Sequence, residues 1–161
     1  MPVHSVTQDP ENLTLTVVGE YDVPASRLWK AWTDPRQLER FWGPPTWPAT
    51  FLEHDLRVGG RAVYQMTGPE GEKAGGYWRF VAVDPGVSFE LMDGFMDENG
   101  EPNAELPETR MRIEIEATPS GSRFTSFSRF PSLEALEQMV AMGMVEGITQ
   151  ALGQLDAVLA D

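Results

Sequence analysis

The stretch "TRMRIEIEA", residues 109–117, guides the interpretation of the whole chain. Its apolar residues Met111, Ile113 and Ile115 alternate with charged residues such as Arg112 and Glu114. Because successive side chains of a β-strand point to opposite faces, this pattern predicts a strand with one buried and one solvated face. Strict alternation of this kind is typical of an antiparallel sheet that is covered on one side only.

Turn-forming segments on both sides of this strand divide the chain into further short strands. They lie at residues 57–60, 68–73, 84–86, 97–102 and 119–122. These breaks separate six strands between about residues 49 and 130. An earlier alternating segment, "LTLTVVGEYDV" (13–23), predicts one more strand and brings the sheet to seven. Residues 1–11 are expected to form a flexible tail.

Helical signals occur before and after the run of six strands. Pro24 and the pair Asp34-Pro35 each suit a helix start, so two short helices are predicted between the first strand and the rest. Ser132 opens a long helix that runs to about residue 160. The chain therefore reduces to one strand, two short helices, six strands and one long helix. Residues 12–161 are predicted to form a single two-layer α+β domain in which that helix covers the dry face of the sheet.

The composition narrows the possible partners. Twelve Lys and Arg against 25 Asp and Glu give a formal net charge of −13, and no basic run interrupts it. Such a surface repels phosphate backbones and anionic lipids, so no nucleic acid and no membrane is expected as a partner. The chain has no Cys, and neither a signal peptide nor a membrane-spanning segment is predicted. A cytoplasmic location is the default expectation.

Four segments in this order and spacing resemble a known superfamily. They are "VPASRLWKAWTDPRQLERFWGPP" (23–45), "HDLRVGGRAVYQMTGPEG" (54–71), "GGYWRFVAVDPG" (75–86) and "RFPSLEALEQMVAMGMVEGITQALGQLDAVL" (129–159). The chain resembles the helix-grip (START, Bet v 1-like, SRPBCC) superfamily, in particular the branch related to the C-terminal domain of the heat shock protein 90 ATPase activator. The resemblance implies a curved seven-stranded sheet that grips the long helix, with a cavity between them. Members of the superfamily include ligand carriers, cyclase-like enzymes, receptors and chaperone cofactors, so fold alone does not define the function.

Metal binding and nucleophilic catalysis find little support in the residues. The two histidines, His4 and His54, are far apart, and strand neighbours of His54 point to the opposite face. There is no Cys nucleophile, no G-x-S-x-G motif and no phosphate-binding glycine loop. We therefore expect neither a metal nor a cofactor.

Acid–base chemistry remains open through carboxylates on the inner face. The inner row of "FELMDGF" (89–95) is expected to contain Phe89, Leu91 and Asp93. On a helical wheel centred on Met144, Glu137 also falls on the side that faces the sheet. Asp93 and Glu137 are thus the two weak catalytic candidates, since burial would raise the pKa of either one toward the working pH.

Small residues opposite the helix predict a cavity. In "SRFTSFSRF" (122–130), Ser126 and Ser128 occupy the middle of an inward row, and Gly147 lies on the inner face of the helix. These side chains fill less volume than Leu or Phe, and an apolar gap with a few hydroxyl groups is typical of a small-molecule site. The predicted ligand-binding residues are Trp42, Tyr64, Met66, Trp78, Phe89, Ser126, Ser128, Val140, Met144 and Gly147. The alternative is that large residues fill the space.

The stretch "EQMVAMGMVEGI" (137–148) has two glycines and three methionines in what is predicted to be mid-helix. The wheel places Met139 and Met142 on the side away from the sheet. Together with neighbouring apolar residues they would form an exposed patch, which is interpreted either as scattered surface residues or as a homodimer interface.

Three functions are therefore considered. The first is a non-catalytic protein that binds a small hydrophobic or amphipathic molecule, and it is favoured over an enzyme. The second is a chaperone-cofactor role, which rests on the resemblance alone. The third is a cyclase or dehydratase that uses an inward acid such as Asp93 or Glu137.

Overall fold

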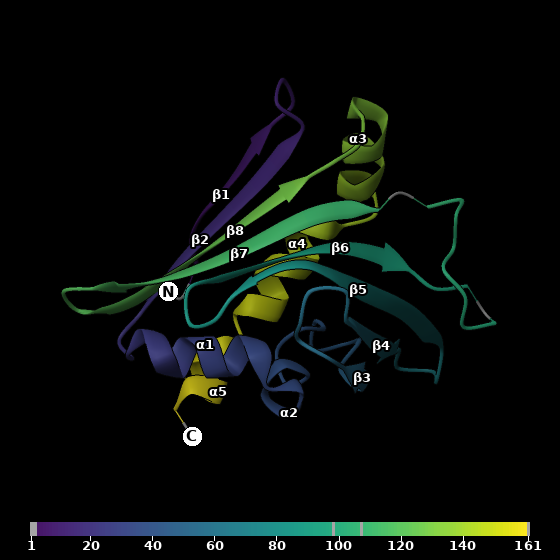
Figure 1. The fold of residues 1–161 in the computed structure, drawn as a ribbon. Coiled ribbons are helices and arrows are strands. Elements are labelled where there is room, and N and C mark those ends of the chain that lie inside the picture. Colours follow the sequence, from purple (N-terminus) through teal and green to yellow (C-terminus); the bar gives the residue numbers. More distant parts are fainter. Residues whose placement is uncertain (1–2, 98, 107, 161) are drawn as a thin grey trace.

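An antiparallel sheet of eight strands forms the body of the protein in the computed structural model, which describes residues 3–97, 99–106 and 108–160. The strands are β1 (Val3–Asp9), β2 (Thr14–Tyr21), β3 (Ala49–His54), β4 (Arg61–Thr67), β5 (Lys73–Asp84), β6 (Ser88–Phe95), β7 (Thr109–Thr118) and β8 (Gly121–Arg129). Their order across the sheet is β1-β2-β8-β7-β6-β5-β4-β3. The sheet curves around the C-terminal helices (Figure 1), which confirms the predicted α+β helix-grip fold class.

The sheet has one strand more than predicted, because residues expected to form a tail form β1. This strand pairs with β2 in an antiparallel register, with Val6 opposite Val17 and Gln8 opposite Leu15. Val6 is half-buried and packs against the core, whereas Thr7 and Gln8 are exposed. The prediction of a flexible tail at residues 1–11 is therefore wrong for the described part, while Met1 and Pro2 lie outside the described residues. A mostly polar edge strand lacks the alternation of apolar and polar residues from which the inner strands are predicted.

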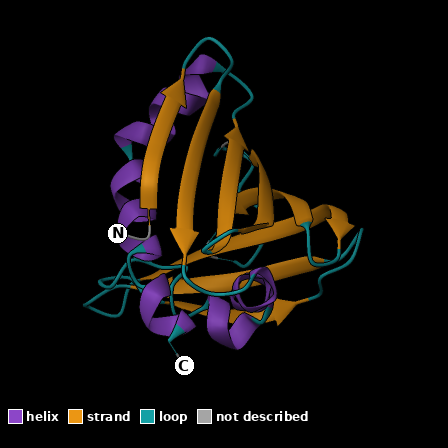
Figure 2. Cartoon of the chain, turned by 90° about the vertical axis from the view of Figure 1, so that its left-hand side faces the viewer, coloured by secondary structure: helices purple, strands orange, loops and turns teal. Residues whose placement is uncertain are grey.

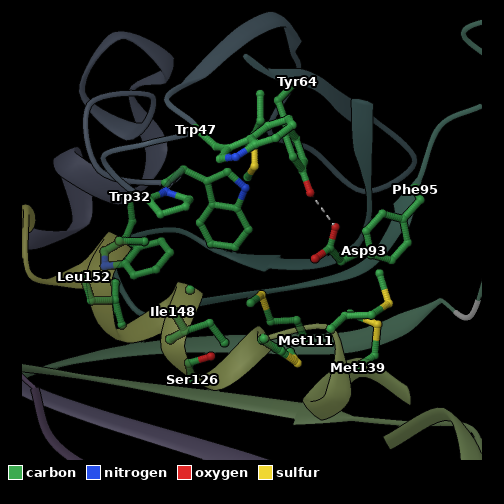
Figure 3. A pocket seen from close by; sticks show the side chains of 18 residues that line it. Trp32, Trp47, Tyr64, Asp93, Phe95, Met111, Ser126, Met139, Ile148 and Leu152 are labelled. Carbon is green, nitrogen blue, oxygen red and sulfur yellow. Dashed lines mark hydrogen bonds between the residues drawn. The ribbon is translucent and has the colours of Figure 1, made fainter. Parts of the chain in front are cut away.

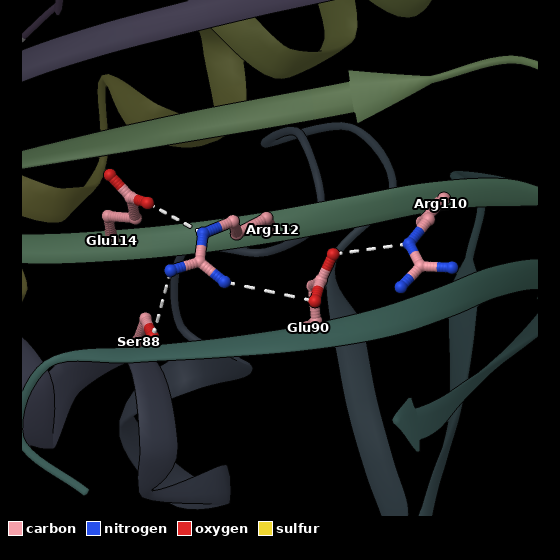
Figure 4. Close-up of polar contacts among 5 residues, drawn as sticks. All are labelled: Ser88, Glu90, Arg110, Arg112 and Glu114. Atoms are coloured by element: carbon pink, nitrogen blue, oxygen red, sulfur yellow. Dashed lines mark hydrogen bonds and ion pairs between the residues drawn. The ribbon is translucent and has the colours of Figure 1, made fainter. Parts of the chain in front are cut away.

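The alternation in residues 109–117 is confirmed on β7. Met111, Ile113 and Ile115 are buried on the concave face. On the convex face Arg110 lies 3.1 Å from Glu90 on β6, within a chain of ion pairs and hydrogen bonds that also includes Ser88, Arg112 and Glu114 (Figure 4). Exposed ion pairs of this kind stabilise a fold only slightly, so the buried row carries most of the stability of this strand.

Two short helices close one end of the curved sheet, as predicted. They are α1 (Ala25–Thr33) and α2 (Pro35–Leu38). Asp34 separates them, and its carboxylate accepts a hydrogen bond of 2.9 Å from the backbone N–H of Arg36, which satisfies one of the free donors at the helix start. Leu28 and Trp32 on α1 are buried against the sheet, so α1 forms part of the core.

Side chains near α2 also bond the free edge of β3. The backbone N–H of Phe51 donates to the Glu39 carboxylate at 2.9 Å, and Arg36 donates to the Phe51 carbonyl oxygen at 2.8 Å. Because β3 is the last strand of the sheet, these two backbone groups have no neighbouring strand to bond. The side chains of Glu39 and Arg36 take the place of that strand at this residue.

The predicted long C-terminal helix is present as a helical segment that is interrupted twice. It consists of α3 (Leu133–Ala141), α4 (Met144–Leu152) and α5 (Leu155–Leu159), which cross the concave side of the sheet (Figure 2). Ser132 caps α3, since its hydroxyl accepts the backbone N–H of Ala135 at 3.0 Å. Gly143 has a φ of 88°, a left-handed conformation that ends α3 and that glycine adopts without strain. Among the described helices, none has the length and apolar character needed to cross a membrane.

Candidate functional site

A pocket of about 320 Å³ lies between the concave face of the sheet and helices α3 and α4 (Figure 3). Its wall is mostly apolar and aromatic. The described residues that line it are Trp32, Trp42, Pro44, Trp47, Tyr64, Met66, Asp93, Phe95, Met111, Ser126, Met139, Met142, Gly143, Met144, Gly147, Ile148, Ala151 and Leu152. A volume in this range and a wall of this composition suit a small organic molecule.

Small residues on both sides account for the space. Ser126 lies in the middle of the inner row of β8, where it is 6% exposed. Gly147 lies across from the sheet on α4, and a Cβ atom built there would meet no other atom within 4 Å. Protein interiors are otherwise closely packed, so a serine and a glycine at these positions leave room that larger side chains would fill.

The break at Gly143 changes which side chains of the helical segment face the pocket. A wheel for one continuous helix places Met139 and Met142 on the far side, but both line the pocket. The same wheel places Glu137 on the inner face, yet Glu137 is exposed and is not among the lining residues. The predicted directions of Met139 and Glu137 are wrong because α3 and α4 do not share one helical phase, whereas Met142 lines the pocket and is also 54% exposed. Glu137 therefore does not share the pocket with Asp93.

Several predicted residues do meet at the pocket. Trp42, Tyr64, Met66, Asp93, Ser126, Met144 and Gly147 all line it. Trp78 and Phe89 lie instead in the main core, fully buried among other aromatic rings. Ser128 is buried on β8, and Val140 packs on a smaller cluster around Leu15 and Phe130. None of these four residues lines the pocket. The predicted cavity wall therefore included residues that belong to the packed core or to the cluster beneath α3.

Other lining residues were missed by the sequence prediction. Met111 and Phe95 continue the inner rows of β7 and β6, so extending those rows would have found them. Trp32 repeats the helical spacing of α1, which alone predicts burial and not contact with a pocket. Trp47 lies in the loop before β3, and loop residues have no periodic signal that would show where they point.

The polar part of the pocket is a set of three residues on neighbouring strands, which we call the inner triplet: Tyr64, Gly76 and Asp93. Tyr64 on β4 pairs directly with Gly76 on β5. A Cβ atom at Gly76 would lie 2.4 Å from the tyrosine ring, so only glycine lets the ring lie flat on the sheet. The ring then reaches β6, where the Tyr64 hydroxyl donates a hydrogen bond of 3.0 Å to Asp93 Oδ1 (Figure 3).

Burial sets the protonation of this triplet. Asp93 is enclosed by protein but keeps some surface toward the pocket, and this loss of solvation raises its pKa from 3.8 to about 7. The hydrogen bond from Tyr64 opposes the shift, and the negative charge of Glu108 adds to it. Burial, followed by the charge of Asp93, raises the pKa of Tyr64 well above its usual value. Near neutral pH the pocket thus holds a carboxyl group able to donate or accept a proton, beside a tyrosine that stays protonated.

The convex face carries a second arrangement of the same kind, which we call the outer triplet: Tyr77, Gly94 and Glu108. Tyr77 on β5 pairs with Gly94 on β6, where a Cβ atom would lie 2.4 Å from the Tyr77 ring. The Tyr77 hydroxyl donates a hydrogen bond to Glu108, and Arg79 lies 3.4 Å from the same carboxylate. Burial, together with the hydrogen bond to Glu108, raises the pKa of Tyr77 to about 12.

An antiparallel sheet that curves around a C-terminal helical segment, with a pocket between the two, defines a helix-grip domain. Residues 22–160 match the family described as activator of Hsp90 ATPase homolog 1-like protein. The chain belongs to this family, which confirms the resemblance found in the sequence.

Solved structures of several proteins share the fold over nearly the whole chain. A crystal structure of a protein from Mycobacterium smegmatis is 47% identical, covers 98% of this chain and 97% of its own, and has a TM-score of 0.90. A solution structure from Arthrobacter aurescens is also 47% identical, with 97% and 91% covered and a TM-score of 0.93. The AHSA1 protein from Silicibacter pomeroyi is 25% identical, with 91% and 97% covered and a TM-score of 0.73. No curated protein gives a significant match.

Proposed function

We propose that this protein binds a small hydrophobic or amphipathic molecule in the pocket between the sheet and helices α3 and α4. The observation that supports the proposal is a space of about 320 Å³ with an apolar and aromatic wall and one carboxyl–hydroxyl pair. Membership of a helix-grip family agrees with a ligand-binding role. Transfer of an apolar molecule from water into such a wall is favourable by about 25 cal/mol for each Å² of apolar surface removed from water.

The test is to fill the pocket without disturbing the fold. Gly147→Leu places a side chain where a Cβ atom meets nothing within 4 Å, and it also improves helix propensity. Gln150→Leu adds the same side chain at an exposed position on α4 and serves as the matched control. Thermal-shift and native mass-spectrometry screens with lipids, aromatics and polyketides should show binding to the wild type and to Gln150→Leu, but not to Gly147→Leu. Equal binding to all three proteins would contradict the proposal.

An enzymatic role is a separate proposal and rests on Asp93. A buried carboxyl group with a pKa of about 7 beside a hydroxyl donor is suited to general acid–base catalysis of a cyclase or dehydratase type. Asp93→Asn should then abolish turnover of a bound substrate while binding is retained. Full turnover by this variant would remove Asp93 from the mechanism.

A chaperone-cofactor role is also a proposal, supported by the name of the family. It predicts that the purified chain changes the ATPase rate of the heat shock protein 90 homologue from the same cell. Gly147→Leu distinguishes this role from ligand binding, since a surface contact with a chaperone would not need the pocket. An unchanged ATPase rate and no recovery in pull-down would contradict it.

Self-association through Met139 and Met142 stays a prediction. Met142 is 54% exposed although it lines the pocket, so it lies at the border between pocket and solvent. Sedimentation of a double substitution of both residues to Gln would show a change of mass if they mediate a homodimer, and an unchanged mass would contradict it.

We further propose a cytoplasmic location, which agrees with a chain that has no cysteine and so needs no oxidising compartment for disulfides. Cell fractionation with an antibody against the chain tests it, and recovery outside the cytoplasmic fraction would contradict it.

A further inference from the structure

The pocket contains a carboxylate for which the described residues supply no counter-ion. Among the described lining residues, Asp93 is the one with an acidic side chain, and no Lys, Arg or His is present in this part of the wall. Tyr64 donates to Oδ1, and no other described side chain donates to this carboxylate. The other carboxylate oxygen of Asp93 points into the pocket (Figure 3), where it can accept a hydrogen bond from a ligand.

Other carboxylates of the sheet have the cation that Asp93 lacks. Arg79 lies 3.4 Å from Glu108, Arg110 lies 3.1 Å from Glu90, and Arg61 lies 2.9 Å from Glu53. Those groups are partly or largely solvated, so they need the cation less than an enclosed carboxylate does. A buried charge is costly unless it is paired and hydrogen-bonded. The group with the largest need for a counter-ion is thus the one without it.

The rest of the wall also suits a cation with an apolar body. Aromatic rings of Trp32, Trp42, Trp47, Tyr64 and Phe95 line the pocket. Electron-rich ring faces attract ammonium groups, most strongly where water is excluded. An anion in the same place would meet a carboxylate with no basic side chain to offset the repulsion. The net charge of −13 further favours the approach of cations over anions.

We propose that the ligand of this pocket is a hydrophobic amine, whose ammonium group binds Asp93 and the adjacent ring faces while its apolar body packs against Met111, Ile148 and Leu152. This inference rests on the proposed ligand-binding function and names the chemical class of the ligand. It separates an amine from a fatty alcohol, which would bind by its apolar body alone, and from a fatty acid, which the pocket would exclude.

The test uses three probes with the same phenyl ring and four methylene groups but different heads: phenylbutylamine, phenylbutanol and phenylpentanoate. Titration calorimetry at pH 8 measures each against the wild type, Asp93→Asn and Asp84→Asn. Asp84 is exposed at the end of β5 outside the pocket, so its variant is a control for the same change of charge. For the wild type and Asp84→Asn we expect the amine to bind at least about tenfold more tightly than the alcohol, and the acid most weakly. For Asp93→Asn the preference for the amine should disappear.

A second measurement needs no variant and so does not depend on the folding of Asp93→Asn. Near pH 6.5 a protonated Asp93 carboxyl must lose its proton when an ammonium group binds, while the amine and the Tyr64 hydroxyl keep theirs. Calorimetry in two buffers of different ionisation enthalpy should therefore detect proton release with phenylbutylamine and none with phenylbutanol. The facing groups that also influence this titration are Tyr64 on β4 and Glu108 before β7.

The outcomes separate the two proposals. Equal or tighter binding of the alcohol or the acid to the wild type would overturn the amine inference and leave pocket binding intact. Retention of the amine preference by Asp93→Asn would overturn it as well. If none of the three probes binds, and no compound of the wider screen binds either, the proposed function itself fails and the inference fails with it.

Discussion

The inner triplet and the outer triplet are the same local structure in two environments. In each, a tyrosine lies across a glycine on the next strand and donates its hydroxyl to a carboxylate beyond it. The inner carboxylate, Asp93, is enclosed and has no cation among the described lining residues, whereas Glu108 on the convex face has Arg79 beside it. The comparison teaches that sheet geometry positions the pair, while solvent access and a neighbouring charge determine its chemistry.

The largest expected difference between the triplets is in the dependence of stability on pH. The pKa of Asp93 is raised from 3.8 to about 7, a shift of about 3 units or on the order of 4 kcal/mol. Since the folded state binds this proton more tightly than the unfolded state, the free energy of unfolding should fall as pH rises from about 4 to about 7 and then level off. Asp93→Asn should lack this fall. Urea unfolding at several pH values measures it, with Asp84→Asn as the control.

A parallel profile for the wild type and Asp93→Asn would show that Asp93 is solvated like an ordinary carboxylate. The comparison of the two triplets would then lose its electrostatic basis.

A smaller difference is expected when each glycine is replaced. In Gly76→Ala the new methyl group overlaps the Tyr64 ring, which packs against Trp42, Phe51 and Trp78 and has little room to move. We expect a loss of about 2–3 kcal/mol in the free energy of unfolding. Gly94→Ala overlaps Tyr77 in the same way, but this half-exposed ring can turn toward solvent, so about 1 kcal/mol is expected. Denaturant unfolding of both variants measures the difference, and equal losses would contradict this account.

Removal of each hydroxyl should separate the triplets further. Tyr64→Phe leaves the enclosed Asp93 without its donor, and we expect a cost of about 1–3 kcal/mol in the free energy of unfolding above pH 8, where the carboxylate is charged. Tyr77→Phe should cost less than about 1 kcal/mol, since water and Arg79 remain near Glu108. Unfolding at pH 8 and at pH 5 tests this, because the cost of Tyr64→Phe should decrease when Asp93 is protonated. A cost that does not change with pH would contradict the assignment of Asp93 as the acceptor.

The smallest effect is expected from the cation itself. Arg79→Gln removes the positive charge beside Glu108. The carboxylate of the outer triplet then lacks a neighbouring cation from Arg79, as Asp93 lacks one in the pocket wall. Both side chains of this ion pair are more than a third exposed, so the free energy of unfolding should change by less than about 0.5 kcal/mol. Thermal unfolding at low and high salt checks this. A loss of several kcal/mol would show that Glu108 depends on its cation as an enclosed group would.

The inner rows were the part of the site that the sequence predicted well. Tyr64, Met66, Asp93 and Ser126 line the pocket because strand periodicity fixes the face to which each side chain points. The order of strands and helices followed in the same way from turns and alternation.

The helical part of the site could not be predicted by the same reasoning. A wheel assumes one continuous helix, but Gly143 adopts a left-handed conformation and ends α3, so Met139 and Glu137 point in directions that the wheel does not give. Periodicity also says nothing of Trp47, which reaches the pocket from a loop, or of β1, where Val6 is the one described side chain that packs against the core. Contacts made in tertiary structure determine these features.

The hydrogen bonds of Glu39 and Arg36 with the backbone of Phe51 also affect how copies of this chain can associate through the edges of their sheets. An open sheet ends in strands whose unused N–H and C=O groups can recruit a strand from another copy, which is how ordered aggregates begin. At β3 the side chains of Glu39 and Arg36 already occupy such groups, and at the opposite edge β1 presents the exposed polar side chains of Ser5, Thr7 and Gln8. The sheet can therefore stay open around a pocket while strand-by-strand polymerisation is disfavoured at its β3 edge.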